Sequence, residues 1–420
     1  MTALLFSVFL IGLLLGIPIA FAIAIAAVVV LIKGDVNLLI VVQRMFAATD
    51  SFSLIAVPFF ILAGDLLARG AISKRLVTFA ESVIGRIRGG LSVVSVVAGM
   101  FFAAISGSGA ATTAAVGATL IPELKKRGYK EDSSTALIAS AGCIGVVIPP
   151  SVPMVLYAVI ADQSVTQLFQ NGFLPGIMMG GILIAISLKQ AYKYNYPMGA
   201  EFSWKHMWKT FKEAIWGLLM PIIILGGIFS GYFTPSEAAA VAVAYSLLIS
   251  MFLYRDITLK EIGKIMLGSA KTSAIIMIII SCSGIFGWVL ANWKIPETVA
   301  QGILSISTSK YIVLFLISII ILVAGVFMET SSAVILLTPV FLPLIRTLGV
   351  DLIHFGLIFT IGISIGMITP PVAINLYVGS SITGMPIERI AKVVLPYLFG
   401  LIVVFLLYVY LPIFIPGLIF

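Results

Sequence analysis

The segment IGVVIPPSVP, residues 144–153, decides the fold that the sequence predicts. It places two adjacent prolines, Pro149 and Pro150, in the middle of a stretch that is apolar enough to cross a membrane. Because proline removes a backbone donor and clashes with the preceding turn, a regular helix is interrupted at this pair. Interrupted backbone at membrane depth persists only where protein or a water-filled cavity satisfies its polar groups. The pair therefore predicts a broken helix beside a binding site, with a simple proline kink as the alternative.

The composition is that of a polytopic membrane protein. Of the 420 residues, 61% are hydrophobic and 10% are charged, whereas a soluble domain carries roughly 25% charged residues. Two apolar segments, 90–121 and 311–345, carry the polar stretches SGSGAATT and METSS halfway, which predicts two re-entrant hairpins, with paired full crossings as the alternative. Nine other apolar segments approach or exceed the ~20 residues that span a bilayer, and they predict full crossings at 4–32, 52–68, 134–161, 168–188, 214–230, 235–254, 272–292, 353–380 and 395–415.

Lys and Arg are distributed unevenly over the segments between these crossings. With the N-terminus inside, 20 of them fall in the cytoplasmic segments 69–88, 125–130, 189–212, 255–271 and 389–392, and five fall outside. The positive-inside rule then predicts a cytoplasmic N-terminus and a periplasmic C-terminus. The net charge of +8 therefore reports orientation, and no nucleic-acid partner is predicted. The stretches SKRLVTFAESVIGRIR and WKHMWKTFKEAI predict amphipathic helices that lie along the cytoplasmic interface.

One constant, ungapped offset in residue number relates two parts of the chain. It aligns Pro122 with Pro343, Gly128 with Gly349, and IGVVIPP at 144–150 with IGMITPP at 365–371. The charge count puts the base of the first hairpin inside and that of the second outside, so the copies are predicted to be antiparallel. Inverted repeats with interrupted helices are the architecture of secondary transporters, whose sites lie at the repeat interface near the bilayer midplane.

The predicted fold class is therefore an all-α polytopic membrane protein with an inverted-topology repeat, two re-entrant hairpins and two broken helices. Five segments divide it: 1–88, a first scaffold segment with a cytoplasmic arm helix; 89–161, hairpin 1 and its broken helix; 162–309, a second scaffold segment with arm helices; 310–382, hairpin 2 and its broken helix; and 383–420, a C-terminal arm and the last transmembrane helix.

Each hairpin tip is predicted to face a break and to form a cation site with it. Unwound carbonyls and hydroxyls can hold sodium without a full negative charge. Ser106 and Ser108 stand at the first tip and face the break at 145–150, whereas 325–330 faces the break at 366–371, which contains Thr369. We call each pair of a hairpin tip and the break that it faces a cradle. The two cradles are similar, and they predict two cation sites. Hydroxyls that bond their own helix are the alternative.

Differences between the copies predict the contacts to an asymmetric substrate. Ser106, Ser151 and Glu329 are the leading substrate contacts because each is unmatched in the other copy. A carboxylate at membrane depth is expensive and usually functional, and the alternative for Glu329 is a protonated side chain that caps the hairpin. At the same offset, Ser106 aligns with Phe327, Ser151 with Val372 and Ser108 with Glu329.

Four stretches together resemble the large membrane subunit of tripartite ATP-independent periplasmic (TRAP) transporters: FFAAISGSGAATTAAVGATLIPELKKRGY, GCIGVVIPPSVPMVLYA, GYFTPSEAAAVA and ITPPVAINLYV. The resemblance covers essentially the whole chain. It implies a sodium-driven elevator in the bacterial inner membrane, in which hairpins and broken helices form a moving transport domain. It also implies two partners, a small four-helix membrane subunit on a separate chain and a periplasmic substrate-binding protein. The family's substrates are organic acids, including C4-dicarboxylates and sialic acids. The sequence as a whole most resembles the sequences of sialic-acid members.

The resemblance also assigns residues to roles. It implies at least two sodium ions and neither an organic cofactor nor a transition metal. The family's substrate serines carry over to Ser106 and Ser151, and an acidic position, which is aspartate in sialic-acid members, carries over to Glu329. Its sodium sites carry over, in several cases through backbone carbonyls, to Ser106, Gly145, Ile148 and Pro150, and to Gly325, Gly366 and Thr369.

Rival classes are an intramembrane enzyme, a passive channel and a stand-alone sodium-coupled carboxylate carrier that needs no binding protein. The sequence contains no HExxH or GxGD motif and no Ser/His pair within its spans, which disfavours the enzyme. Both cysteines lie in apolar runs, so no disulfide is predicted. Asp65 is predicted to be structural and to pair with Arg69 at helical spacing.

Overall fold

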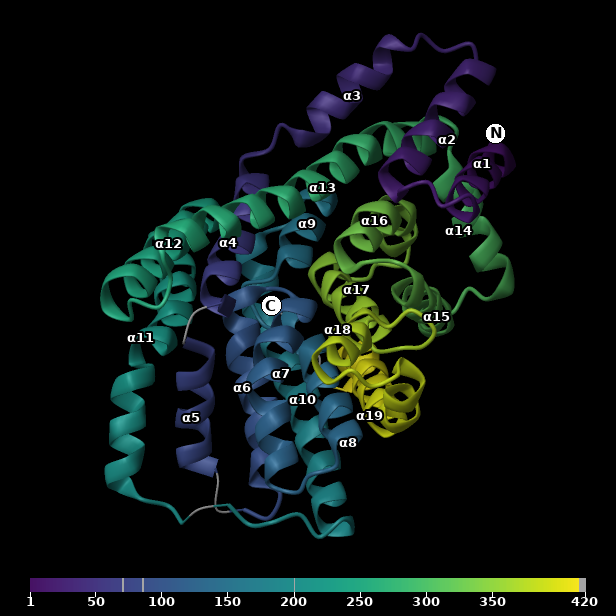
Figure 1. Cartoon of the computed structure of the whole chain (residues 1–420). Coiled ribbons are helices and arrows are strands. Elements are labelled where there is room, and N and C mark those ends of the chain that lie inside the picture. Colours follow the sequence, from purple (N-terminus) through teal and green to yellow (C-terminus); the bar gives the residue numbers. More distant parts are fainter. Residues whose placement is uncertain (70–71, 85–86, 200, 415–420) are drawn as a thin grey trace.

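The computed structural model describes residues 1–69, 72–84, 87–199 and 201–414 (Figure 1). These residues form helices and no β-strand. Seven of the described helices are long and apolar enough to cross a membrane, or up to eight if the bent pair at 39–68 is counted as one span. The predicted all-α polytopic class is therefore confirmed. The last six residues, on which the predicted periplasmic C-terminus falls, lie outside the described residues.

The helices fall into four groups along the chain. The first group is α1 (Thr2–Leu14), α2 (Ile19–Lys33), α3 (Leu39–Thr49), the 3₁₀ helix η1 (Phe52–Ile55), α4 (Ala56–Arg69) and α5 (Ile72–Ile84). The second is α6 (Gly90–Ser106), α7 (Gly109–Lys126), α8 (Glu131–Cys143), the 3₁₀ turn η2 (Ile144–Val146) and α9 (Val152–Ala161). The third is α10 (Val165–Lys193), α11 (Trp204–Phe229), α12 (Pro235–Leu248), the π-helical η3 (Ile249–Leu253), α13 (Leu259–Asn292) and α14 (Ile295–Ile306). The fourth is α15 (Lys310–Phe327), α16 (Thr330–Thr347), α17 (Leu352–Gly366), α18 (Ile374–Thr383) and α19 (Ile387–Phe414).

The prediction of one crossing over 4–32 is wrong. The chain turns between α1 and α2, and the two helices pack against each other. Gly16 supports the turn with a φ of +77°, a conformation that side chains with a Cβ resist, and Pro18 cannot continue the first helix. A Cβ at Gly12 would lie 3.3 Å from the Cβ of Ala22, so α1 folds back along α2 as a hairpin.

The predicted interface helices are only partly correct. Residues 72–84 form the separate helix α5, which packs against α11. The stretch WKHMWKTFKEAI is instead the first part of α11, and it continues without interruption into the predicted span at 214–230. Likewise α13 joins much of the basic segment 255–271 to the following span in one helix of 34 residues. Neither a proline nor a glycine pair stands at the point where each arm joins its span, and the proline of α11, Pro221, lies further along within the span itself.

Both predicted breaks are present in the structure. The helical turns before the first break end at Val146, and α9 begins at Val152; α17 ends at Gly366, and α18 begins at Ile374. The element bounds follow the offset of the sequence alignment, because α16 begins and ends at the positions equivalent to the ends of α7, and α17 begins at the position equivalent to the start of α8. The Pro149–Pro150 and Pro370–Pro371 peptides are both cis.

The two related parts interlock rather than standing side by side. The second half of the first broken helix, α9, packs against α16 of the second hairpin. The second half of the other broken helix, α18, packs against α7 and α8. Around this core, α13 runs across the upper side of the molecule in Figure 1 and contacts α2, α3, α4 and α16. The breaks therefore lie where both parts meet.

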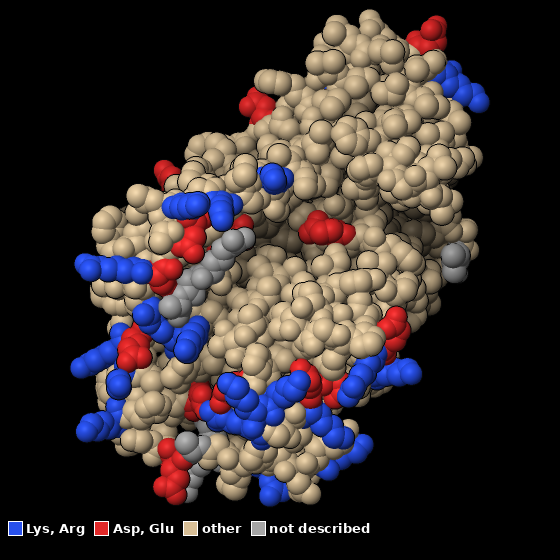
Figure 2. Space-filling view, in the orientation of Figure 1, with Lys and Arg blue, Asp and Glu red and all other residues tan. Residues whose placement is uncertain are grey.

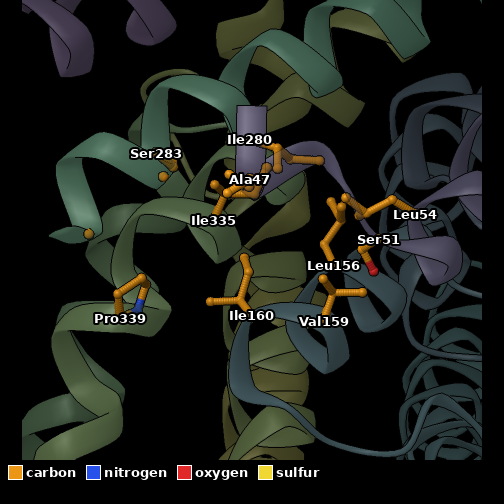
Figure 3. A pocket seen from close by; sticks show the side chains of 13 residues that line it. Ala47, Ser51, Leu54, Leu156, Val159, Ile160, Ile280, Ser283, Ile335 and Pro339 are labelled. Carbon is orange, nitrogen blue, oxygen red and sulfur yellow. The ribbon is translucent and has the colours of Figure 1, made fainter. Parts of the chain in front are cut away.

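A cavity of about 400 Å³ separates α3 and α13 from α9 and α16 (Figure 3). Its walls are mainly apolar, with Ala47 of α3, Ile280 of α13, Leu156 of α9 and Ile335 of α16 pointing toward one another. The two sides of this cavity thus come from the predicted scaffold and the predicted transport domain respectively.

The charged side chains are segregated along the molecule. Figure 2 shows Lys and Arg gathered at the lower end and the left edge, with few over the upper part. Side-chain contacts join the five basic segments predicted to be cytoplasmic: Arg127–Glu81 at 2.6 Å, Arg88 Nη1 to Asn195 Oδ1 at 3.2 Å, Arg389–Asp132 at 3.2 Å, and Arg75 over the Tyr254 ring at 3.5 Å. These segments therefore share one end of the fold, as the charge count predicts.

Candidate functional site

A second cavity, of about 460 Å³, lies where the two hairpin tips meet the scaffold. Figure 2 shows a hollow near the middle of the face that it draws. Of the residues predicted from the sequence, Ser106 and Glu329 line this cavity, so the structure brings the two hairpin tips to one space. Scaffold helices α4 and α13 complete the wall with Asp65, Thr272 and apolar side chains.

Four helix N-termini converge on the cavity. The first residues of α7, α9, α16 and α18 all line it. Each helix N-terminus carries unpaired backbone N–H groups and about half a positive charge. Among the described lining residues there is no Lys or Arg, whereas two carboxylates, Asp65 and Glu329, are present. The partial positive charge at this cavity therefore comes from the helix ends and not from basic side chains.

Ser106 ends the first arm of hairpin 1 and is buried. Its hydroxyl lies 2.9 Å from Thr112 Oγ1, accepts from the Ser108 backbone N–H at 3.4 Å and donates to the Ser108 carbonyl at 3.3 Å. The tip itself turns at Gly107, with a φ of +60°. The hydroxyl is thus held within the tip but still lies on the cavity wall.

Glu329 is the N-cap of α16. Its Oε2 accepts hydrogen bonds from the backbone N–H groups of Ser331 at 2.9 Å and Ser332 at 3.1 Å, and the Ser331 hydroxyl donates to Oε1 at 3.2 Å. Its counterpart in the first copy, Ser108, caps α7 in the same way. The capping role that the sequence left as an alternative is therefore real, and it holds an exposed carboxylate at the cavity.

Ser151 lies behind the cavity wall, not on it. It is fully buried, its hydroxyl donates to the Val146 carbonyl at 2.5 Å, and it accepts from the Met154 backbone N–H at 3.4 Å. Ser151 thus ties the start of α9 back across the first break. The residues that follow it, Val152 and Pro153, are the ones that reach the cavity.

Hairpin 1 closes tightly on the first break. A Cβ at Gly145 would lie 2.6 Å from Thr112 Oγ1 and 2.7 Å from the Ser108 carbonyl oxygen, and a Cβ at Gly107 would lie 2.7 Å from the Pro150 carbonyl oxygen. The side chain of Ile148 packs on α10 at Gly176. The predicted members of the first cradle are therefore neighbours in space.

The second cradle is built by an even closer backbone approach. A Cβ at Gly366 would overlap the carbonyl group of Gly325, so only glycine fits at this crossing. Thr369 is half-buried, and its hydroxyl donates to the Ile365 carbonyl at 2.9 Å. Gly325, Gly366 and Thr369 are thus brought to one break, although the threonine hydroxyl bonds its own helix. The described residues contain no group of three or more His, Cys, Asp or Glu side chains that could hold a metal ion.

Sequence reasoning missed two contributors to the cavity. Asp65 was predicted to be structural and to pair with Arg69, whose side chain lies outside the described residues; Asp65 also lines the cavity and accepts a hydrogen bond from Ser269 of α13 at 2.6 Å. Met367, inside the second break, also lines the cavity, and the Thr330 hydroxyl lies 3.4 Å from its sulfur. A carboxylate inside the apolar run FFILAGDLLARG was the available signal for Asp65.

Comparison with known proteins identifies the family. Residues 6–414 match the family model described as "Tripartite ATP-independent periplasmic transporter, DctM component". The isethionate TRAP transporter permease protein DctMQ of Oleidesulfovibrio alaskensis is 39% identical over 97% of this chain, and the chain spans 65% of that protein. The C4-dicarboxylate large permease protein DctM of Pseudomonas aeruginosa is 40% identical over 88% of this chain and 86% of its own length. The 2,3-diketo-L-gulonate large permease protein YiaN of Escherichia coli is 36% identical over 96% of this chain and 95% of its own length.

Two solved structures share the fold at low sequence identity. The YdaH transporter of Alcanivorax borkumensis superposes with a TM-score of 0.64 at 14% identity, covering 90% of this chain and 88% of its own. MtrF of Neisseria gonorrhoeae superposes with a TM-score of 0.68 at 13% identity, covering 92% of this chain and 86% of its own. The family match over nearly the whole length confirms the resemblance read from the motifs, and the relatives are transporter permease subunits rather than enzymes. This chain therefore belongs to the DctM family of large permease subunits of TRAP transporters.

Proposed function

We propose that this chain is the transport subunit of a sodium-driven carrier that moves an organic acid across the bacterial inner membrane into the cytoplasm. The observation that carries the proposal is the cavity at the hairpin tips, where four helix N-termini meet Asp65 and Glu329. Helix dipoles favour an anion, and carboxylates favour cations. A site with both features suits the joint binding of an organic anion and sodium ions.

The anion is held by backbone donors and hydroxyls rather than by a basic side chain. The cavity offers the N-terminus of α7 together with Ser106, whereas at α16 the N–H groups of Ser331 and Ser332 already bond Glu329. Helix N-termini are ready-made anion sites because their N–H groups point at the ligand. Ser151 acts behind the wall, and Glu329 orders the second tip while it faces the cargo.

Two sodium ions occupy the two cradles, one at each break. The first would use Ser106 and the carbonyls of Gly145, Ile148 and Pro150, and the second would use the carbonyls of Gly325 and Gly366 with Thr369. The supporting observation is that each set of residues, although distant in sequence, is drawn together at one break. Sodium accepts oxygen ligands from unwound backbone in carriers of this architecture.

Transport proceeds by an elevator motion. The two hairpins are re-entrant and, with their broken helices at 89–161 and 310–382, form an inverted-topology repeat that moves as one body. Its support is the interlocking of α9 with α16 and of α18 with α7 and α8, which would keep the two copies together. The cavity of Figure 3 separates this body from α3 and α13, which belong to the scaffold.

The cargo is an organic acid of the C4-dicarboxylate class or a related acid, with sialic acid retained as an alternative. The relatives named above are permeases for C4-dicarboxylates, isethionate and 2,3-diketo-L-gulonate, all of which are small organic acids. A small four-helix membrane subunit and a periplasmic binding protein are the partners. The binding protein delivers the acid to the periplasmic face.

The basic end of the molecule faces the cytoplasm, as the positive-inside rule requires. The cavity then lies toward the cytoplasmic ends of the scaffold helices, because Asp65 and Ser269 stand next to the basic segments 69–88 and 255–271. The fold-back of α1 on α2 supports a periplasmic N-terminus, near Lys33, in place of the cytoplasmic one predicted from the sequence.

The test is uptake into proteoliposomes that contain this chain and its small subunit. Labelled succinate, isethionate and N-acetylneuraminate are offered with and without an inward sodium gradient, and with and without the binding protein. Saturable uptake that needs sodium is the expected result. Undiminished uptake in potassium-only buffer would contradict sodium coupling, and full activity without a binding protein would favour a stand-alone carrier.

A further inference from the structure

Two cavities follow each other along α13. Residues of α13 within 272–279 line the cavity at the hairpin tips, and residues within 280–287 line the cavity of Figure 3. Helix α16 follows the same order, because its N-terminal residues within 330–332 line the first cavity, whereas Ile335 and Pro339 line the second. The two helices are in contact. They therefore run side by side, in the same direction, past both cavities.

One face of α13 presents a hydroxyl to each cavity. Thr272 lines the cavity at the tips, and Ser283 lines the cavity of Figure 3. The two residues stand eleven positions apart, which is about three helical turns, so they lie on nearly the same face and about 16 Å apart along the axis. Two other lining residues, Ile276 and Gly287, repeat this spacing. The scaffold thus offers the same kind of polar group at two levels.

Ser283 differs from the other hydroxyl side chains of α13 in its surroundings. The remaining hydroxyl side chains of this helix all make hydrogen bonds: Ser269, Thr272, Ser273 and Ser281. The Oγ atom of Ser283 is buried, and it has no hydrogen-bond partner among the described residues. A buried hydroxyl without a partner costs free energy. A serine at this position is explained if another state of the protein supplies the partner.

The surroundings of Ser283 leave room for such a partner. The cavity of Figure 3 has a volume of about 400 Å³, close to the 460 Å³ of the cavity at the tips. On α13 it is bordered by Gly284, which packs on α3, and by Gly287, whose Cβ position has nothing within 4 Å. The opposite wall is formed by α9 and α16, which belong to the body proposed to move. Movement of that body toward the periplasm would bring the hairpin tips to this level of α13.

We propose that Ser283 is a positioning residue, on which the tip of hairpin 2 docks when the transport site opens to the periplasm. The inference rests on the proposed function and adds the scaffold contact of its second state. A slide of about three helical turns carries Glu329, which shares a cavity with Thr272, to the level of Ser283. The Ser283 hydroxyl then donates to the Glu329 carboxylate, which is exposed at the cavity in the present state and can accept further hydrogen bonds.

A serine that only fills space predicts a different outcome. In that case Ser283→Ala removes an unsatisfied hydroxyl and leaves transport unchanged. If the hydroxyl holds the tip, Ser283→Ala lowers the population of the outward-open state about fivefold, and the external KM for the acid rises by the same factor. Ser283→Thr keeps the hydroxyl and is expected to resemble the wild type. Ser281→Ala is the matched control, because its hydroxyl bonds the Met45 carbonyl of α3 instead.

The experiment combines this measurement with cross-linking of the tip to the scaffold. Ser332→Cys on hairpin 2 is paired with Ser283→Cys in a chain in which Cys143→Ala and Cys282→Ala remove the native thiols. Proteoliposomes with the full chain and the small subunit are treated with a short bifunctional thiol reagent during sodium-driven uptake. The pair is expected to cross-link and uptake to stop, because the two residues line different cavities in the present state and meet only after the slide.

Two further pairs fix the register of the slide. Ser332→Cys with Thr272→Cys is expected to cross-link in the state described by the structure, because both positions line one cavity. Ser332→Cys with Ser281→Cys is expected to stay unlinked, because the Ser281 side chain bonds α3. If Ser332→Cys abolishes uptake, Ala111→Cys on the tip of hairpin 1 replaces it, since Ala111 lines the same cavity.

A chain that takes up acid but gives no cross-link at Ser283→Cys would overturn the inference, and so would an external KM in Ser283→Ala equal to that of the wild type. Cross-linking at Ser281→Cys as strong as at Ser283→Cys would also overturn it. A wild type that shows no sodium-driven uptake of the three acids would refute the proposed function, and the inference with it. Intact uptake with either of the first two results would refute the inference alone.

Discussion

At the scale of single residues, the breaks are defined by glycines that permit contact and by polar groups that cap helix ends. Gly366 and Gly325 touch through their backbones, and Gly145 lets the first tip approach its break. Glu329 and Ser151 each occupy an N-cap, but Glu329 faces the cavity whereas Ser151 is sealed behind it. Two residues with the same local role therefore differ in what they present to a ligand.

Gly366→Ala is expected to abolish uptake and lower the melting temperature. Its Cβ would overlap the carbonyl group of Gly325, and backbone must move to make room. Overpacking of this kind costs about 1–3 kcal/mol or more. Gly226→Ala on α11 is the control, because nothing lies within 4 Å of its Cβ position. Wild-type uptake in Gly366→Ala would show that this backbone contact is dispensable.

Glu329→Gln is expected to keep the cap and lose transport. The amide oxygen of glutamine can still accept from the N–H groups of Ser331 and Ser332, so the melting temperature stays within a few degrees of the wild type. Loss of a charge at membrane depth is expected to reduce sodium-dependent uptake about tenfold. Uptake kinetics and thermal unfolding are measured on the same preparation. Unchanged kinetics would remove Glu329 from the transport site and leave it a cap alone.

At the scale of elements, each break is stabilised by a hydrogen bond that reaches back across it. Ser151 bonds Val146 on the far side of the first break, and the Asn375 backbone N–H bonds the Met367 carbonyl at 2.9 Å across the second. The half-helices α9 and α18 are therefore anchored to their own breaks while they pack on the opposite copy. Each of these two half-helices therefore stabilises both of the related parts of the chain.

Ser151→Ala is expected to affect stability rather than substrate affinity. Removing an N-cap hydroxyl costs about 1 kcal/mol, and the buried Val146 carbonyl would lose its partner. A lower melting temperature with an unchanged KM for the acid is the expected pair of results. Ser108→Ala removes the matching cap of α7 at the cavity and serves as the comparison. A raised KM at an unchanged melting temperature would return Ser151 to the substrate site.

At the scale of the whole molecule, the hairpins and broken helices are interlocked, and α3 and α13 lie across a mainly apolar cavity from α9 and α16. Between them lies the cavity of Figure 3, whose walls carry small or apolar side chains. The proposed elevator would use this gap for movement, and it would also have to break polar contacts elsewhere, such as Arg127–Glu81 between the end of α7 and α5.

Gly287→Phe is expected to arrest this motion without disturbing the fold. Gly287 of α13 lines the cavity, and nothing lies within 4 Å of its Cβ position, so a larger side chain can extend from it into the cavity. A side chain that fits one state alone shifts the population toward it, and uptake is expected to fall about tenfold or more. The control is Gly268→Phe, on the same helix and also in open space. Normal uptake in Gly287→Phe would argue against movement across this cavity.

The sequence by itself determined the breaks, the constant offset that relates them and the grouping of basic segments. These features depend on local chemistry. Proline and glycine change the conformation of their own backbone, and Lys and Arg concentrate on the cytoplasmic side of a membrane. Ser106 and Glu329 were found because polar groups are costly in an apolar run.

Only the tertiary structure decided that α1 folds back on α2, that the arms continue into α11 and α13, and that Ser151 is sealed off while Asp65 faces the cavity. Each of these outcomes depends on packing in three dimensions: Asp65 bonds Ser269, which is distant in the chain, and Gly12 packs on Ala22 across the turn between α1 and α2. Periodicity and composition describe one segment at a time, and they carry no information on which distant segment covers it.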